Sequence, residues 1–343
     1  MKTWTYISKR FGLLLVASAL SHGAHAQDEQ AQKGLRIATG PGNGVYVQIA
    51  KDMQKVCGQS VPLVLVPSKG GLDNLNLLSS SQADVGFSQV DVLEQMSKEG
   101  DQNIQELQAV MAMHSNLLHV ITRTDGSRIN QTKMPFSQAY VPLSGELRVL
   151  RKFSDLNIKG VKVVLVGSAA LMGQTLERQL GYGMTFLQAD SDEKAISLLQ
   201  SRQADAIFTT GGWPYPTVSN LRRDSGLMLA EYDLQPPTPF LTTRRNYPEL
   251  DAMKMNFLAS TNLFLTRPFK LTGERGKQVA ALRKCILNNF DELKEGAYSS
   301  VWKEIKAPFV TFGVAIYGNP DAATSSTAPA AKTVSKQISK QEY

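Results

Sequence analysis

Residues 77–87, with the sequence LLSSSQADVGF, return at residues 198–208 as LLQSRQADAIF, identical at seven of eleven positions. Each copy reads as the end of a helix, a tight turn at Gln-Ala-Asp and a buried strand. One short match could be a coincidence between two ordinary helix-to-strand corners. The segments that precede the two copies agree as well, which favours a structural unit that occurs twice.

A strand, a loop of small residues and a helix come before each copy. In the first half, the strand 35–39 enters the glycine-rich loop 40–44, and a helix follows up to Gly58. In the second half, the strand 161–166 enters the loop 167–170. Alternating strands and helices are typical of parallel sheets. We therefore predict an α/β, two-lobed fold of the periplasmic-binding-protein type, each lobe a mainly parallel sheet flanked by helices, with the ligand cleft between the lobes.

A late strand and a long amphipathic helix follow a Pro-rich stretch and suggest a return of the chain to the first lobe. Lobe 1 is thus predicted as the discontinuous pair 35–124 and 231–318, and lobe 2 as 125–230. Residues 127–150 look like extra sequence ahead of the second lobe. Residues 319–343 are rich in Ala, Ser, Thr, Pro and Lys without periodicity, which predicts a disordered tail.

The first 26 residues have the pattern of a cleavable signal peptide. A basic start precedes an apolar stretch at 11–20 and a small-x-small motif at 24–26. We expect the mature chain to begin near Gln27, with a short leader at 27–34. The apolar stretch has about half of the ~20 residues that a bilayer span needs, so an uncleaved anchor is the weaker reading and a periplasmic protein is expected.

Charge gives little support to a nucleic-acid partner. The 343-residue chain carries 37 Lys and Arg against 30 Asp and Glu, a formal charge of +7, with the basic residues spread along the sequence. Removal of the signal peptide takes three of the positive charges, which leaves 34 against 30, or +4. No tract of five or six basic residues occurs, so nucleic-acid binding is disfavoured.

Reactive side chains are few beyond residue 26. Cys57 and Cys285 either form a disulfide between distant segments or remain two buried thiols, and the sequence leaves both open. His114 and His119 would lie on opposite faces of a strand, which argues against a metal site. The familiar metalloprotease, hydrolase, nucleotide-binding and redox motifs are missing. We expect no catalytic residues, no metal and no cofactor.

Candidate binding residues follow the predicted strands, where open parallel sheets bind ligands. The loop 39–46 combines three glycines with a helix start, which favours an anion such as a carboxylate. It misses the dinucleotide fingerprint because Val45 stands where that pattern has its last glycine. Lys69 could neutralise an acid group or simply be exposed. Gln89 can donate and accept hydrogen bonds, whereas Asp91 is favoured as the N-cap of the next helix.

Other candidates come from the second half and from the segment between the lobes. Ser168 begins a predicted helix, and Trp213 and Tyr215 could either cover a ligand or fill the core. His114 is expected to point into the cleft, while His119 is interpreted as structural.

Several stretches resemble the TAXI group of TRAP-transporter solute receptors, periplasmic proteins of the type II two-lobed fold. They are the strand 35–40 with the helix start that follows it, the block 83–91, the segment 155–163 and the loop 204–214. The resemblance extends over about residues 35–317. It departs at 167–170, where the family usually has Gly-Ser-Gly-Thr and this chain has Gly-Ser-Ala-Ala.

The resemblance implies a receptor that captures a small anionic solute, such as an amino acid or a dicarboxylate, and delivers it to TRAP membrane permease subunits. A monomer is expected. The alternatives are an exported enzyme that uses the same cleft, with His114 or a carboxylate as base, and a ligand-free homologue that acts as a protein-interaction module. The predicted ligand-binding residues are Thr39, Gly40, Gly42, Asn43, Gly44, Val45, Tyr46, Ser68, Lys69, Gly70, Gln89, His114, Ser168, Ala169, Gly212 and Trp213.

Overall fold

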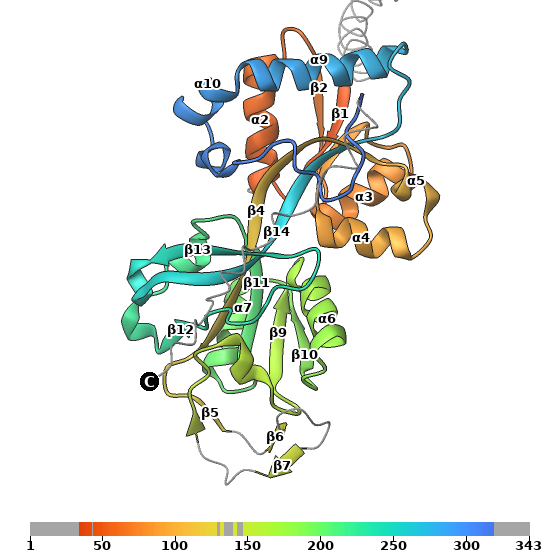
Figure 1. The fold of residues 1–343 in the computed structure, drawn as a ribbon. Coiled ribbons are helices and arrows are strands. Elements are labelled where there is room, and N and C mark those ends of the chain that lie inside the picture. Colours follow the sequence, from red (N-terminus) through yellow and green to blue (C-terminus); the bar gives the residue numbers. More distant parts are fainter. Residues whose placement is uncertain (1–33, 43, 129–130, 134–139, 143–146, 319–343) are drawn as a thin grey trace, which may run out of the picture.

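The computed structural model describes residues 34–42, 44–128, 131–133, 140–142 and 147–318 (Figure 1). The predicted signal peptide, nearly all of the predicted leader, Asn43 and the predicted tail lie outside these residues, as does much of the insertion predicted between the lobes. Within the described ranges, no helix has the length and apolar character needed to span a membrane.

The described elements alternate between strands and helices in both halves of the chain. In order they are β1 (Leu35–Ala38), α2 (Val45–Cys57), β2 (Leu63–Val66), α3 (Gly71–Ser79), β3 (Val85–Gln89), α4 (Val90–Lys98), α5 (Gln102–Gln105), β4 (Gln108–Arg123), β5 (Ser127–Arg128), β6 (Gln131–Lys133), β7 (Tyr140–Pro142), β8 (Leu147–Arg148), η1 (Phe153–Leu156), β9 (Lys162–Val166), α6 (Ala169–Leu180), β10 (Thr185–Ala189), α7 (Asp192–Gln200), β11 (Ala206–Gly211), α8 (Pro216–Ser219), η2 (Arg223–Ser225), β12 (Leu227–Leu229), β13 (Leu241–Tyr247), η3 (Pro248–Leu250), β14 (Ala252–Thr266), α9 (Glu274–Asn288), α10 (Phe290–Glu295) and η4 (Ser300–Glu304).

One sheet of ten described strands runs through two lobes. In lobe 1, at the top of Figure 1, β2, β1 and β3 are parallel, and β3 pairs antiparallel with the end of β14. In lobe 2, β10, β9 and β11 are parallel, and β11 pairs antiparallel with the second half of β4. The long strands β4 and β14 pair with each other and pass from one lobe into the other (Figure 1). The two-lobed α/β fold predicted from the sequence is confirmed.

The repeated Gln-Ala-Asp unit has the same local structure in both lobes. The residues just before it, Ser81 and Arg202, have φ angles of 62° and 61°, which end the preceding helix in the left-handed conformation. The aspartate of each copy then accepts the backbone N–H of the neighbouring first strand. Asp84 Oδ2 lies 3.0 Å from the nitrogen of Arg36, and Asp205 Oδ2 lies 3.0 Å from the nitrogen of Lys162. Each repeat therefore joins a helix end, a turn and two adjacent strands.

Apolar cores cover both faces of the sheet in each lobe. Phe257 and Ala259 of β14 pack with Ile121 and Ile207 in a core of lobe 2, whereas Leu263 of β14 packs in a core of lobe 1. We propose that the chain returns to lobe 1 inside β14, near Ser260, and not at residue 231 as the sequence suggested. On this proposed division, the Pro-rich stretch, which connects β12 to β13, lies within lobe 2 and is not the crossover.

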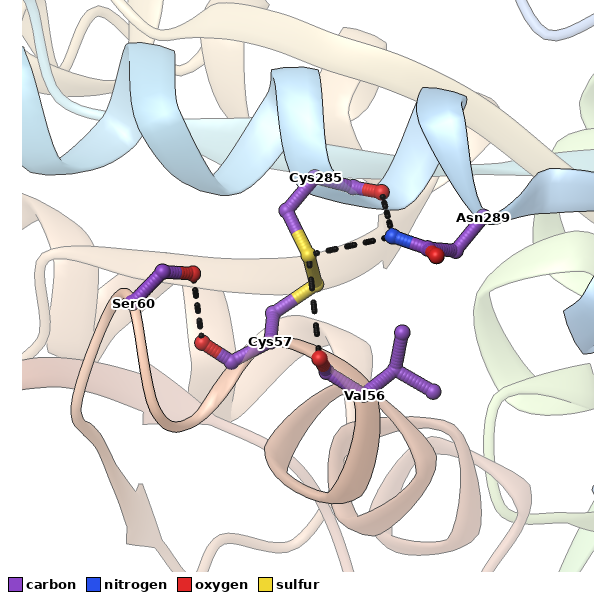
Figure 2. Close-up of a disulfide and its surroundings, with 5 residues drawn as sticks. All are labelled: Val56, Cys57, Ser60, Cys285 and Asn289. Atoms are coloured by element: carbon purple, nitrogen blue, oxygen red, sulfur yellow. Dashed lines mark hydrogen bonds between the residues drawn. A yellow bond between two sulfur atoms is a disulfide. The ribbon is translucent and has the colours of Figure 1, made fainter.

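A disulfide joins the end of α2 to α9 in lobe 1 (Figure 2). Cys57 and Cys285 are separated by 228 positions in the sequence, and Cys57 is buried in the lobe 1 core. The side-chain amide of Asn289 donates to the carbonyl oxygen of Cys285 at 2.8 Å, which holds the last turn of α9 beside the bond. Of the two readings that the sequence left open, the structure has the disulfide.

Candidate functional site

A cavity of about 760 Å³ lies between the two lobes. Lobe 1 contributes the loop between β1 and α2, two residues of β4 and the start of η4, while lobe 2 contributes the loops that follow β9, β10 and β11. The described residues that line it are Gly40, Pro41, Gly44, Val45, Tyr46, Gln48, His114, Asn116, Val166, Ser168, Asp190, Ser191, Asp192, Glu193, Thr210, Gly211, Gly212, Trp213, Pro214, Tyr215, Pro216, Thr217, Ser299, Ser300 and Val301.

The first wall of the cavity is the start of α2. Gly44 is the N-cap residue and provides no side-chain cap, so the first backbone N–H groups of the helix are open to a ligand. These groups and the helix dipole favour a negatively charged group at this end of the cavity. The cap position is also crowded, because a Cβ on Gly44 would lie 3.0 Å from the carbonyl oxygen of Pro41.

The floor of the cavity is built on the strands that join the lobes. Tyr46 donates its hydroxyl proton to the side-chain oxygen of Asn262 on β14, and the amide of Asn262 donates to the carbonyl oxygen of His114 on β4 at 2.9 Å. This chain of hydrogen bonds fixes α2 to both crossing strands. Burial raises the pKa of Tyr46, with a further contribution from Asp91, so the phenol stays protonated.

His114 is the most buried polar group that lines the cavity. Its side chain is 1% exposed, and among the described residues neither ring nitrogen has a hydrogen-bond partner. Burial lowers its pKa to about 4, although the Asn116 side chain opposes this shift. The imidazole is therefore neutral at pH 7, with one N–H to donate and one nitrogen to accept.

The second wall belongs to lobe 2 and is rich in hydroxyl groups. Ser168 and Thr210 share a hydrogen bond of 2.6 Å across the starts of two loops. Asp192 accepts hydrogen bonds from Thr209, Tyr215 and Thr217, at 2.5 to 2.7 Å. This carboxylate holds the loop after β11 against the start of α7, and the loop places Trp213 beside the cavity.

Gly211 sets the position of one aromatic ring in this wall. A Cβ at Gly211 would lie 2.2 Å from the ring of Tyr215, so any larger residue would displace that ring. Tyr215 in turn stacks on His119, with the ring centroids 5.1 Å apart. His119 is fully buried and bonded to the hydroxyl of Tyr247 at 2.8 Å, which agrees with its interpretation as a structural residue.

The predicted site residues divide into two groups. Eight line the cavity: Gly40, Gly44, Val45, Tyr46, His114, Ser168, Gly212 and Trp213. Seven do not: Thr39, Gly42, Ser68, Lys69, Gly70, Gln89 and Ala169. Asn43 lies outside the described residues.

The loop with Lys69 is held away from the cavity by Asn74. This side chain, fully buried, donates to the carbonyl oxygens of Thr39 and Phe87 at 2.7 Å and accepts the Ser68 hydroxyl proton at 2.5 Å. The hydroxyl of Ser68 is thus used inside lobe 1, and the side chain of Lys69 is exposed. Gln89 is 2% exposed, does not line the cavity and lies beside Asn262 in the sheet.

Residues 190–193 and 299–301 are cavity residues that the sequence reasoning missed. The first group follows β10 at the same edge of the sheet as the other loops, so its position after a strand was an available signal. It has no glycine, and so lacks the pattern from which the other binding loops were predicted. The second group reaches the cavity only through tertiary packing of the C-terminal segment, which no local pattern indicates.

The charge of the cavity lining is negative. Asp190, Asp192 and Glu193 line it, and none of its described lining residues is a lysine or an arginine. Arg245 packs on the ring of Trp213 at 5.5 Å, but its guanidinium is paired with Glu304 at 2.5 Å and does not line the cavity. That ion pair connects β13 in lobe 2 to η4, so it also bridges the two lobes beside the cavity.

No family model matches the chain. Solved structures similar to it include an amino acid ABC transporter substrate-binding protein from Streptococcus pneumoniae bound to L-arginine, with 14% identity, 81% of this chain and 95% of that chain covered, and a TM-score of 0.45. An ancestral cationic amino acid solute-binding protein has 11% identity over 82% of this chain and 98% of its own, with a TM-score of 0.43. The periplasmic VFT2 domain of Bordetella pertussis BvgS has 15% identity, the same two coverages and a TM-score of 0.40.

Proposed function

We propose that this protein is a periplasmic solute receptor, which closes its two lobes around a small solute and delivers it to a membrane permease. One observation carries the proposal: a cavity lined by both lobes includes residues of β4, which pairs with β14, and these are the two strands that connect the lobes. A rotation of the lobes about these strands would open and close the cavity without breaking either core.

The cavity also has the composition of a binding site. It combines an uncapped helix start, a cluster of hydroxyl groups, two partly exposed aromatic rings and a buried imidazole with unused hydrogen-bonding capacity. Small-molecule sites commonly join such convergent polar groups to aromatic surface. Its volume of about 760 Å³ has room for a solute the size of an amino acid or a small dicarboxylate.

A carboxylate on the solute would be bound by the N–H groups at the start of α2, because no lysine or arginine is among the described lining residues. The resemblance of residues 35–50, 83–91 and 204–214 to the TAXI group supports delivery to a TRAP-type permease. In this proposal the receptor acts as a monomer and releases its solute chemically unchanged.

Calorimetric titration of a chain that begins at Gln27 tests this function, with a panel of amino acids, dicarboxylates and oxo acids. We expect at least one solute to bind and to raise the unfolding temperature with the logarithm of its concentration. Gly212→Leu should abolish binding, because a Cβ at this position already lies 3.5 Å from the ring of His114 and a larger side chain would fill the cavity.

Gly212→Ala is the matched control, since its single methyl group fits at ordinary contact distance. Both variants should unfold at the same urea concentration as the parent. Conversion of a bound solute to product, lost in His114→Gln, would instead favour the exported enzyme. Failure of the whole panel to bind would favour the interaction module.

A further inference from the structure

Two carboxylates of the cavity have no partner among the described side chains. Asp190 and Glu193 are exposed at the start of α7, line the cavity, and make no hydrogen bond or ion pair with another described residue. Asp192 lies between them in sequence and differs, because three hydroxyl groups satisfy its carboxylate. Both unpaired carboxylates are therefore available to a ligand.

The groups around these carboxylates do not offset their charge. His114, which has no hydrogen-bond partner among the described residues and is 1% exposed, is neutral because burial lowers its pKa to about 4. Among the described residues, the guanidinium of Arg245, which packs on the ring of Trp213, is already paired with Glu304. An anion without a positive group would meet a net negative wall in lobe 2.

The wall of the cavity that belongs to lobe 1 favours a negatively charged group. The open N–H groups at the start of α2 and the positive end of the helix dipole favour a carboxylate there. The ring of Trp213, on which Arg245 packs, adds an aromatic surface on the lobe 2 side, and aromatic faces attract cations. The neutral imidazole of His114 lies on the strand between the two walls, beside Asn116, and neither of its nitrogens has a hydrogen bond of normal geometry with a described residue, so it can bond to either end of a polar solute.

We infer that the cavity selects solutes that carry both a carboxylate and an ammonium group, with Asp190 and Glu193 of lobe 2 contacting the ammonium. The carboxylate is bound at the start of α2 in lobe 1. This inference rests on the receptor function proposed above and narrows its solute to amino acids, at the expense of oxo acids and dicarboxylates. Asp190 and Glu193 are assigned as specificity-determining residues.

Pairs of probes that share a carbon skeleton test the inference. L-Glutamate is compared with 2-oxoglutarate and L-alanine with pyruvate by calorimetry, on the parent chain and on the variant Asp190→Asn/Glu193→Gln. Within a pair, the amino acid should bind about 10-fold to 100-fold more tightly than the oxo acid, the range for a charge-assisted hydrogen bond. The double variant should lose this preference while it binds the oxo acid at least as well.

The control variant Glu274→Gln/Asp291→Asn removes the same two charges from exposed positions of α9 and α10, which do not line the cavity. It should keep the preference of the parent. An oxo acid that binds as tightly as its amino acid would overturn the inference and leave the receptor function standing, as would a preference that survives in the double variant. Failure of every probe to bind would overturn both.

Discussion

Loss of the bond between Cys57 and Cys285 should destabilise lobe 1 and leave the cavity unaffected. A crosslink lowers the entropy of the unfolded chain in proportion to the logarithm of the loop that it closes. The 228 positions between the two cysteines correspond to about 5 kcal/mol on this relation. The loop includes all of lobe 2, and a lobe 2 that remains folded shortens its flexible part. We therefore expect a loss of about 2 to 5 kcal/mol.

Trp302 provides the signal for the measurement. Its side chain is fully buried in the lobe 1 core, and its indole nitrogen donates to Asp52 at 2.9 Å. In a chain that begins at Gln27 and carries Trp213→Phe, it is the remaining tryptophan, so its fluorescence reports on lobe 1. With a urea slope of about 2 kcal/mol/M, the expected loss lowers the unfolding midpoint by about 1 to 2.5 M.

Two perturbations separate the crosslink from the packing of the sulfur atoms. Reduction in urea followed by refolding in reductant keeps both side chains and removes only the bond. Cys57→Ala/Cys285→Ala also removes the sulfur atoms and should destabilise further, because Cys57 is 1% exposed. Alkylation and mass measurement verify that both thiols are free. A reduced protein that unfolds at the midpoint of the oxidised one would refute the reasoning.

Two further predictions concern acid. Burial lowers the pKa of His114 to about 4 and of His119 to about 3, so the unfolded chain binds protons below pH 6.5 that the folded chain does not. Each histidine should cost about 2 kcal/mol of stability at pH 5 relative to pH 7. Burial also raises the pKa of Asp91 to about 6, so at pH 5 the folded chain binds a proton that the unfolded chain does not. This stabilises the fold by about 1 kcal/mol over the same interval and offsets part of the loss from the histidines. The urea midpoint should therefore fall from pH 7 to pH 5 in the parent but not in His114→Asn/His119→Gln. The same fall of the midpoint in both proteins would contradict this prediction. Burial opposes ionisation of Asp84, yet bonds from Arg36 and nearby arginine charge lower its pKa overall. Asp84→Asn should cost roughly 2 to 3 kcal/mol at pH 7. The loss should vanish in acid, since the contribution of Asp84 is present above about pH 4 and disappears as the pH falls through its lowered pKa. The equivalent Asp205→Asn should cost less because that carboxylate is 23% exposed, against 1% for Asp84.

The sequence predicted the fold through local patterns that the structure uses in the same way in both lobes. Asp84 and Asp205 occupy the same position of the sequence repeat, and each accepts a hydrogen bond from a backbone N–H of the neighbouring strand. The point at which the chain returns to lobe 1 was harder to predict from the sequence. β14 is one strand whose first part packs in lobe 2 and whose last part packs in lobe 1. Its register against β4 shifts after Thr261, but no glycine or proline in residues 252–266 marks the change in the sequence.

The candidate site was predictable where glycine-rich loops and helix starts coincide, as at Gly44 and Ser168. It was not predictable where a buried side chain diverts a loop, as Asn74 does for Lys69. The acidic residues after β10 have the ordinary composition of a helix start, since carboxylates are favoured in a first turn whether or not a ligand is present. Only the neighbourhood across the cavity distinguishes Asp190 and Glu193 from such residues.

The passage of β14 through both lobes also determines the order in which the protein can fold during synthesis. The sheet of lobe 2 is formed by segments between β4 and the first part of β14, so it can be completed while the rest of β14 is still being made. The parallel strands β1, β2 and β3 emerge first, yet the edge of β3 stays unpaired until residues 262–266 arrive. An exposed edge of this kind invites pairing with other chains. The earliest part of the chain is therefore the part whose sheet edge stays exposed longest.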